Sequence, residues 1–217
     1  LWRADAPAMR QAGAMIRAES MSTAVVYTDE QKGAIQKRTV RVLLFSQASG
    51  GVGLVATYIV SALLAKDITG SATLATIAAA CLSIGAALVS FPLSRIMAKK
   101  GRRAGLRMAY LVGVGGAGIA LVAAITRSYP LLCIGVLGAG AGNAANLATR
   151  YAAADLAADD RRARTISLIV WATTIGSTTG SVASGFASDF GRNIGLPDKS
   201  GSYLLSGLLF LVAAGIV

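Results

Sequence analysis

Long apolar stretches, separated by short polar loops, dominate the pattern of this chain. Five stretches hold about 20 mostly apolar residues each, roughly the helix length that crosses ~30 Å of hydrocarbon. They cover residues 42–64, 72–94, 104–126, 131–153 and 165–187. A sixth begins near Tyr203 and runs to Val217, so at ~1.5 Å per residue it extends only about 22 Å. The pattern predicts an all-α integral membrane protein with six transmembrane helices, the sixth truncated and the chain a fragment of something longer.

The composition agrees with long membrane-embedded segments. Hydrophobic residues make up 54% of the chain, the mean hydropathy is +0.61 and only 14% of residues are charged, against about a quarter in soluble domains. Glycine is frequent inside the apolar stretches, where small side chains let helices approach closely in lipid. Four of these glycines are expected to mark helix packing: Gly138, Gly142, Gly176 and Gly180.

The basic residues indicate how the chain is oriented. The formal net charge is +11, but Lys and Arg gather in the short segments between apolar stretches, so no nucleic-acid partner is expected. Fourteen precede the first stretch or lie in the second-to-third and fourth-to-fifth loops, against four in the opposite loops. Because positive loops stay in the cytoplasm, we predict a multi-pass plasma-membrane protein with a cytoplasmic N-terminus.

The residue inventory excludes some chemistry. The chain has no His, which excludes a His-ligated zinc ion and a His general base. Cys81 and Cys133 both lie inside apolar stretches, where we interpret them as small buried hydrophobes. No metal site and no cofactor is predicted.

The N-terminal region differs from the rest of the chain. The first 20 residues are charged and have no apolar core of signal-peptide length, and Met21 is a candidate native start. We therefore interpret residues 1–38 as a polar N-terminal segment, with residues 1–20 as a candidate non-native part, and residues 39–217 as the membrane domain.

The loop after the second stretch carries a motif. Residues 94–103 read Ser-Arg-Ile-Met-Ala-Lys-Lys-Gly-Arg-Arg. This resembles the signature loop of the major facilitator superfamily, Gly-x-Leu-Ala-Asp-Arg-x-Gly-Arg-Arg, although Ser94 replaces the first Gly and Ala98 the acid. The resemblance implies a gating role for the matching residues, Lys99, Gly101, Arg102 and Arg103. Orientation of the chain and binding of anionic lipid headgroups are the other roles open to these cations.

Two further patterns support the same resemblance. Residues 176–185 read Gly-Ser-Thr-Thr-Gly-Ser-Val-Ala-Ser-Gly, which is similar to the family's antiporter motif, Gly-x-x-x-Gly-Pro-x-x-Gly-Gly. Residues 185–192 repeat the signature loop in degenerate form three stretches later, on the opposite face of the membrane. This is the inverted 3+3 repeat found within each half of these transporters.

The resemblance implies a function without covalent chemistry. The chain would be the N-terminal six-helix half of a 12-helix transporter that moves a small organic solute by alternating access, with efflux favoured slightly over uptake. Its partners would be the solute, membrane lipid and a missing C-terminal six-helix half. A six-span membrane enzyme and a membrane anchor or assembly subunit remain the alternatives from other classes.

Polar residues within the stretches are the candidates for the substrate pathway, because facing lipid is costly for them. Gln47 and Tyr58 share one helical face of the first stretch, and Asn143 and Asn146 share a face of the fourth. Interhelical hydrogen bonding is the alternative role for all four residues.

Charged residues at the stretch ends suggest a relay of ion pairs. Arg150 and Asp155 lie at a predicted cytoplasmic end, next to a cluster of further Asp and Arg residues, and Asp189 and Arg192 are their counterparts on the outer face. An exposed, salt-bridged loop is the simpler interpretation of the cytoplasmic group.

Overall fold

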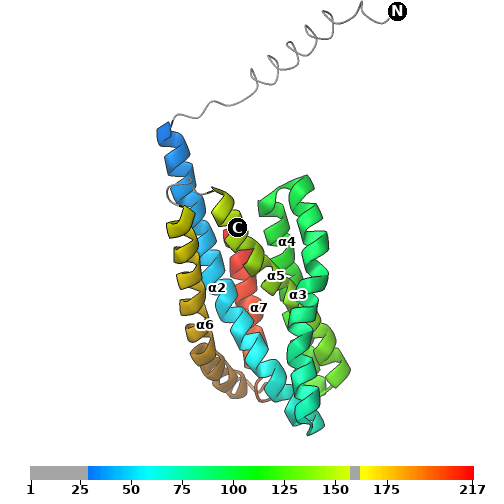
Figure 1. Cartoon of the computed structure of the whole chain (residues 1–217). Helices are drawn as coiled ribbons and strands as arrows, with labels where there is room; N and C mark the ends of the chain where they lie inside the picture. The colour runs from blue at the N-terminus through cyan, green and yellow to red at the C-terminus, as the bar shows by residue number, and fades with distance from the viewer. Residues whose placement is uncertain (1–28, 157–161) are drawn as a thin grey trace, which may run out of the picture. The chain divides into compact units, whose positions relative to one another are not determined.

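The structure, a computed structural model, describes residues 29–156 and 162–217, with side chains described at 39, 41–151, 163, 167, 168 and from 170 onward. The described residues form six helices: α2 (Asp29–Thr69), α3 (Ala72–Lys100), α4 (Arg102–Thr126), α5 (Tyr129–Leu156), α6 (Arg162–Asn193) and α7 (Gly201–Ile216). Each predicted apolar stretch coincides with one of them (Figure 1). Residues 38–217 form one compact unit, and the packing below is that of this unit.

Among the described residues, four segments are long and apolar enough to cross a membrane: Arg41–Thr69, Ala72–Lys100, Arg102–Thr126 and Tyr129–Tyr151. Gly201–Ile216 is apolar but shorter. Helix α6 is long enough, yet it is not among the four, because Thr and Ser recur along it. The sequence predicts six spans. The described residues form six helices, and four of these have both the length and the composition of a membrane span.

Helix α3 shows how local sequence sets element boundaries. Ser71 caps its N-terminus by accepting a hydrogen bond from the backbone N–H of Leu74 (3.4 Å), which satisfies a donor that the helix leaves free. Gly101 ends the helix with φ 84° and ψ 163°. The buried positions recur every three or four residues, so one face packs inward; they include Ala75, Ala78, Leu82, Gly85 and Ala86.

Helices α4 and α5 pack against each other along an extensive contact. Small residues bring the two backbones together: a methyl group added to Gly116 would lie 2.1 Å from the backbone N of Ala139. One added to Gly135 would lie 2.4 Å from the backbone N of Ala120. In lipid such close packing holds helices together, since water exclusion contributes nothing between them.

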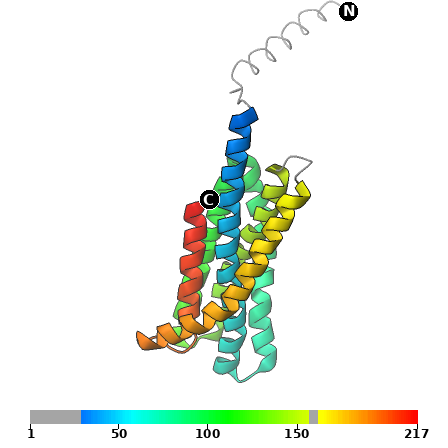
Figure 2. The ribbon, with the colours of Figure 1, turned by 90° about the vertical axis from the view of Figure 1, so that its left-hand side faces the viewer.

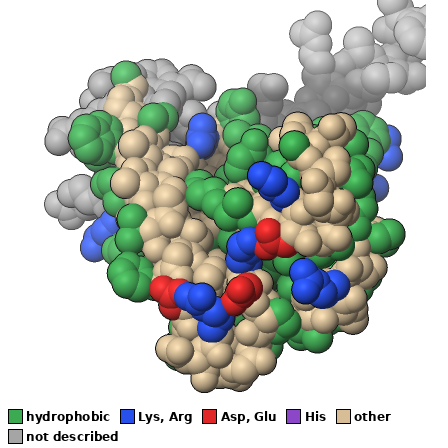
Figure 3. Space-filling view, turned by 90° about the horizontal axis from the view of Figure 1, so that it is seen from below, with side chains coloured by type: hydrophobic (Ala, Val, Ile, Leu, Met, Phe, Trp, Pro, Cys, Tyr) green, Lys and Arg blue, Asp and Glu red, His purple; other side chains and the backbone are tan. Residues whose placement is uncertain are grey.

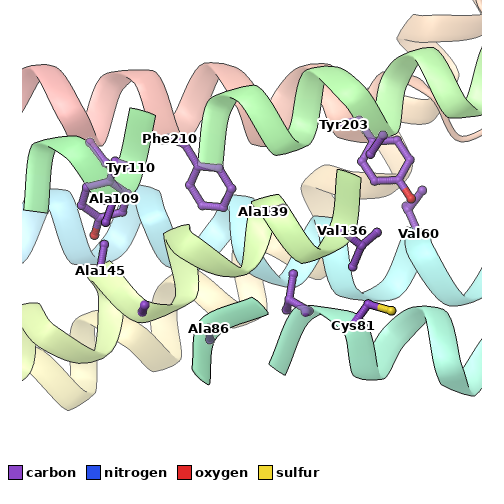
Figure 4. Packing of buried hydrophobic residues seen from close by; sticks show 14 of the residues in the cluster. Val60, Cys81, Ala86, Ala109, Tyr110, Val136, Ala139, Ala145, Tyr203 and Phe210 are labelled. Carbon is purple, nitrogen blue, oxygen red and sulfur yellow. The ribbon is translucent and has the colours of Figure 1, made fainter. Parts of the chain in front are cut away.

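Large side chains fill the space that the small residues leave. Phe210 of α7 is fully buried and points toward α5 near Ala139 (Figure 4). Its ring lies 6.3 Å from that of Tyr110 on α4, centroid to centroid. The aromatic pair therefore joins α4 and α7 across the middle of the bundle.

Helix α6 runs obliquely beside α2 (Figure 2). Its Gly176 and Gly180 face the α2 backbone: added methyl groups would lie 2.7 Å from the carbonyl O of Ala48 and 2.8 Å from that of Val52. The two helices thus touch along one small-residue seam.

Candidate functional site

Gln47 belongs to a group of buried and half-buried polar residues on α2, α4, α5 and α6. Its side chain is fully buried, and its Nε2 donates a hydrogen bond of 2.8 Å to Oγ1 of Thr173 on α6. The neighbouring Ser46 faces the other way around α2, toward the hydroxyl of Tyr110 on α4. We call the following set the buried polar cluster: Ser46, Gln47, Tyr110, Asn146, Thr149, Arg150 and Thr173.

Two glycines of α2 bring these helices together. A methyl group on Gly50 would lie 3.0 Å from the Tyr110 hydroxyl, and one on Gly51 would lie 3.9 Å from Nδ2 of Asn146. Gly50 and Gly51 follow Ser46 and Gln47 by one helical turn each, so the same stretch of α2 faces both α4 and α5. On α5, Asn146 and Arg150 are four residues apart and share a face.

Polar atoms of the cluster remain unpaired within the described part of the chain. They are Gln47 Oε1, Asn146 Oδ1 and Arg150 Nε, all buried and without a hydrogen-bond partner there. The Tyr110 hydroxyl, by contrast, lies close to the side chains of Ser46 and Thr149. The two amide oxygens accept hydrogen bonds, and the guanidinium N–H donates one. Together they offer a polar molecule both kinds of hydrogen bond, in surroundings where an unmade bond is costly.

The predicted pathway residues occupy different surroundings. Gln47 and Asn146 are buried, at 0% and 3% exposed, and belong to the buried polar cluster. Tyr58 is 50% exposed on α2, and Asn143 is half-buried on α5. The structure therefore brings two of the four together, and the substrate-pathway role stays a prediction for each.

Sequence reasoning missed several members of the cluster. Tyr110 stands in an otherwise apolar part of α4, and a lone Tyr there was a usable signal because a buried hydroxyl needs a partner. Ser46, Thr149 and Thr173 carried no such signal. Ser and Thr hydroxyls are commonly satisfied within their own helix, as Thr149 is by the carbonyl O of Ala145 (2.8 Å).

Helix α6 exposes a polar face that the sequence analysis did not single out. Positions three or four apart along it are exposed and polar or small: Thr174, Thr178, Ser181 and Gly185. The three hydroxyls bond back to carbonyls of their own helix, as Thr178 does to Thr174 (3.0 Å). This face contrasts with the exposed apolar side chains Trp171, Ile175, Val182 and Phe186 on the same helix.

The signature-loop residues lie at the junction of α3 and α4. Lys99, Gly101, Arg102 and Arg103 are all exposed. With φ 84° and ψ 163°, Gly101 adopts a conformation that is essentially restricted to glycine, so the chain turns between two nearly continuous helices. The tight turn expected at Gly101 is present, while the gating role stays a prediction.

The other end of the bundle carries balanced charges. Figure 3 shows acidic and basic side chains next to one another on this face. Arg192 pairs with Asp189 and lies 3.8 Å from Asp198, and Lys199 of the α6–α7 loop pairs with Asp67 of α2. Two predicted relay residues, Asp189 and Arg192, therefore contact each other.

The relay group that the sequence predicts at the cytoplasmic end is only partly described. Arg150 is half-buried in the buried polar cluster. The side chain of Asp155 lies outside the described residues, as do those of Asp159, Asp160, Arg161, Arg162 and Arg164. The relay role of Arg150 and Asp155 stays a prediction.

The predicted packing glycines all approach another helix. Gly176 and Gly180 face α2, as described above. A methyl group on Gly138 would lie 2.9 Å from the Cα of Gly116, and one on Gly142 would lie 2.7 Å from Cζ of Phe210. Helix α5 thereby meets α4 on one side and α7 on another.

Fold and site together define a class of protein: a polytopic α-helical membrane protein whose helices enclose polar groups within the bundle, which is typical of transport proteins. Comparison with known families makes this specific. Residues 42–217 match the Major Facilitator Superfamily, and the chain belongs to this superfamily. The family is one of membrane transporters and not of enzymes, in agreement with the expectation of a non-catalytic protein.

Three curated relatives support the assignment. The chain is 38% identical over 188 residues to the uncharacterized MFS-type transporter YddS of Bacillus subtilis (strain 168), covering 87% of this chain and 43% of the relative. It is 35% identical over 192 residues to YdeG of the same strain, covering 88% and 44%. The riboflavin transporter RfnT of Brucella anthropi is 26% identical over 183 residues, covering 83% and 45%. The chain thus spans less than half the length of the curated relatives it matches.

Proposed function

We propose that this chain is the N-terminal half of a 12-helix transporter that moves a small polar organic solute by alternating access. The two halves would rock against each other around a central site, and each half would consist of an inverted 3+3 repeat. The repeated loop motif at residues 94–103 and 185–192 supports the repeat. The relatives' greater length supports a second half of similar size.

The observation that carries the proposal is the buried polar cluster. The three unpaired polar atoms that the described residues place inside the bundle are costly for folding alone. Such groups in membrane proteins usually mark a pathway for polar molecules. The four helices that form the cluster would respond together when a ligand or water satisfies these atoms.

The solute class follows from the donors and acceptors available. Gln47 and Asn146 offer amide oxygens, and Arg150 offers a donor, which suits a solute with neighbouring carbonyl and N–H groups. One relative is named as a riboflavin transporter, so riboflavin is the first compound to test. The antiporter-like residues 176–185 favour efflux, and uptake is the alternative direction.

The proposed location is the bacterial inner membrane, with the N-terminus and the signature loop in the cytoplasm. The basis is the excess of Lys and Arg at that end. The described acidic side chains, Asp67, Asp189 and Asp198, all lie at the other end of the bundle, where ion pairs balance the charge.

Transport by the complete protein tests this function. The full reading frame would be reconstituted in proteoliposomes, and riboflavin movement measured for the wild type, Asn146→Leu and Asn193→Leu. Asn146→Leu should lower the rate at least tenfold, because it removes an amide from the cluster. Asn193→Leu, at the exposed end of α6, serves as the matched control and should leave the rate unchanged.

Two outcomes would count against the proposal. If the wild type moves neither riboflavin nor any compound of a metabolite panel, the transport function is wrong. If Asn146→Leu transports at the wild-type rate, transport stands but the buried polar cluster takes no part in it.

A further inference from the structure

A furrow runs along the outer side of α4 at the signature-loop end. It encloses about 440 Å³ and is lined by Lys100, Arg103, Ala104, Arg107, Met108 and Leu111. The part of the furrow next to the α3–α4 junction is cationic, and the part farther along α4 is apolar. None of these residues belongs to the buried polar cluster.

The three cations of the furrow have no acidic partner in the described part of the chain. Lys100, Arg103 and Arg107 are exposed and form no ion pair there. The acidic side chains that the structure describes lie at the opposite end of the bundle. Arg103 and Arg107 are four residues apart, so they point the same way from α4 and concentrate positive charge at one spot.

Below the cations the same helix face becomes apolar and open. Met108 and Leu111 are about half exposed. Gly115 continues the Arg103–Arg107–Leu111 row, and a methyl group added to it would meet nothing within 4 Å. This glycine serves neither a turn nor a helix contact, unlike Gly116 beside it, and it leaves the helix surface open at this position.

We propose that this furrow binds an anionic phospholipid. The phosphate headgroup would lie among Lys100, Arg103 and Arg107, and one acyl chain would follow Met108, Leu111 and Gly115. Charge complementarity selects an anion, and the apolar continuation selects one that carries a hydrocarbon chain. A soluble phosphate would leave the apolar half of the furrow unused. The predicted cytoplasmic side is also where anionic lipid headgroups attract basic segments.

Lipid retention by the complete transporter tests this site. The detergent-solubilised protein would be mixed with dioleoyl phosphatidylglycerol or dioleoyl phosphatidylcholine, and bound lipids counted by native mass spectrometry. The double variant Arg103→Gln, Arg107→Gln should retain phosphatidylglycerol at least fivefold less than the wild type, with phosphatidylcholine unchanged. Arg127→Gln, which removes a cation at the other end of α4, should bind as the wild type does.

A second variant keeps every charge and tests the chain-binding part. Gly115→Leu should fill this open position and lower phosphatidylglycerol retention, and it needs no rearrangement of the bundle because its surroundings are open. Gly215→Leu is the matched control, since Gly215 of α7 is also exposed and open. The comparison of Gly115→Leu with Gly215→Leu tests the lipid site even if the arginine variants insert poorly into the membrane.

Three results would overturn the proposal. Wild-type protein that does not prefer phosphatidylglycerol would show that something else, such as the other half of the transporter, covers the furrow. Competition by inorganic phosphate together with normal binding by Gly115→Leu would reveal a simple anion site. Equal loss of both lipids in the variants would indicate general damage to the protein surface.

Discussion

At the scale of single residues, the polar groups inside the bundle have to be satisfied by one another or by a ligand. Gln47 illustrates both cases, because its Nε2 bonds to Thr173 while its Oε1 has no partner among the described residues. Membrane interiors offer no water to replace a missing hydrogen bond. A substitution that removes one partner of a buried hydrogen bond therefore leaves the other partner unsatisfied, which lowers the stability of the fold.

The Gln47–Thr173 hydrogen bond is expected to couple α2 and α6. Gln47→Leu and Thr173→Val should each lower stability, and the double variant should lose less than the sum. The coupling energy should be about 0.6 kcal/mol, the average for interhelical hydrogen bonds in membranes, and below ~1.7 kcal/mol. A double-mutant cycle on thermal unfolding in detergent measures it, and strictly additive losses would mean that the two side chains do not interact.

Gly138 is expected to tolerate no side chain. An added methyl group would lie 2.9 Å from the Cα of Gly116, which is backbone and cannot move aside cheaply. Gly138→Leu should destabilise the protein by about 1–3 kcal/mol or prevent folding. Gly118→Leu is the control, because a methyl group there meets nothing within 4 Å. Equal melting temperatures for the two variants would contradict the α4–α5 packing.

Asn143 is expected to affect the solute rather than the fold. It is half-buried on α5, one turn from Asn146, so its amide can reach a polar ligand without being sealed in a helix contact. Asn143→Leu should raise the KM for transport several-fold while leaving the melting temperature within a degree or two. Unchanged kinetics for every transported solute would remove Asn143 from the pathway.

At the scale of elements, the junction between α3 and α4 is a turn whose conformation is essentially restricted to glycine. Gly101 combines φ 84° with ψ 163°, and a β-branched residue there is strained by about 1–3 kcal/mol. Gly101→Val should therefore displace the exposed cations of the loop and reduce transport, with insertion into the membrane intact. Ala98→Val, three residues earlier on an exposed helical position, is the control. Normal transport by Gly101→Val would leave the loop with an orienting role alone.

At the other end of the bundle, ion pairs rather than a glycine turn hold the loop. Asp67 and Lys199 join the end of α2 to the α6–α7 loop, but both side chains are partly exposed. Exposed ion pairs contribute only ~0–1 kcal/mol because water and salt screen them. These pairs therefore select a geometry for the loop more than they stabilise the bundle.

At the scale of the whole molecule, the orientation in the membrane decides which end meets the cytoplasm. The charge distribution predicts that Gly101 and its neighbours are cytoplasmic and that Arg192 is not. Single cysteines at Lys100 and Asn193, in a background without Cys81 and Cys133, should differ in intact cells. An impermeant thiol reagent should label position 193 and not position 100, and the reverse pattern would invert the topology.

Much of the architecture could be predicted from the sequence. The apolar stretches predicted the six described helices, because in hydrocarbon every backbone group has to bond within its own helix. The structure extends several ends, for example α3 to Lys100, since charged residues continue a helix beyond the apolar core. Helix α6 was predicted as a full span, but Thr and Ser interrupt its apolar composition while still bonding to their own backbone.

The sequence by itself determined the membrane character, the helix order, the turn at Gly101 and the family, because these depend on local composition, spacing and motif. Only the tertiary structure decided which polar side chains meet. Helical periodicity placed Gln47 and Tyr58 on one face of a single helix, yet Gln47 is buried against α6 and Tyr58 is half exposed. Thr173 lies 126 positions from its partner Gln47 along the chain, and Tyr110 lies 64 positions from its partner Ser46. No local pattern encodes such distances. These partners meet because Gly50, Gly51 and Gly176 let the backbones approach, and that approach is a property of the packed bundle.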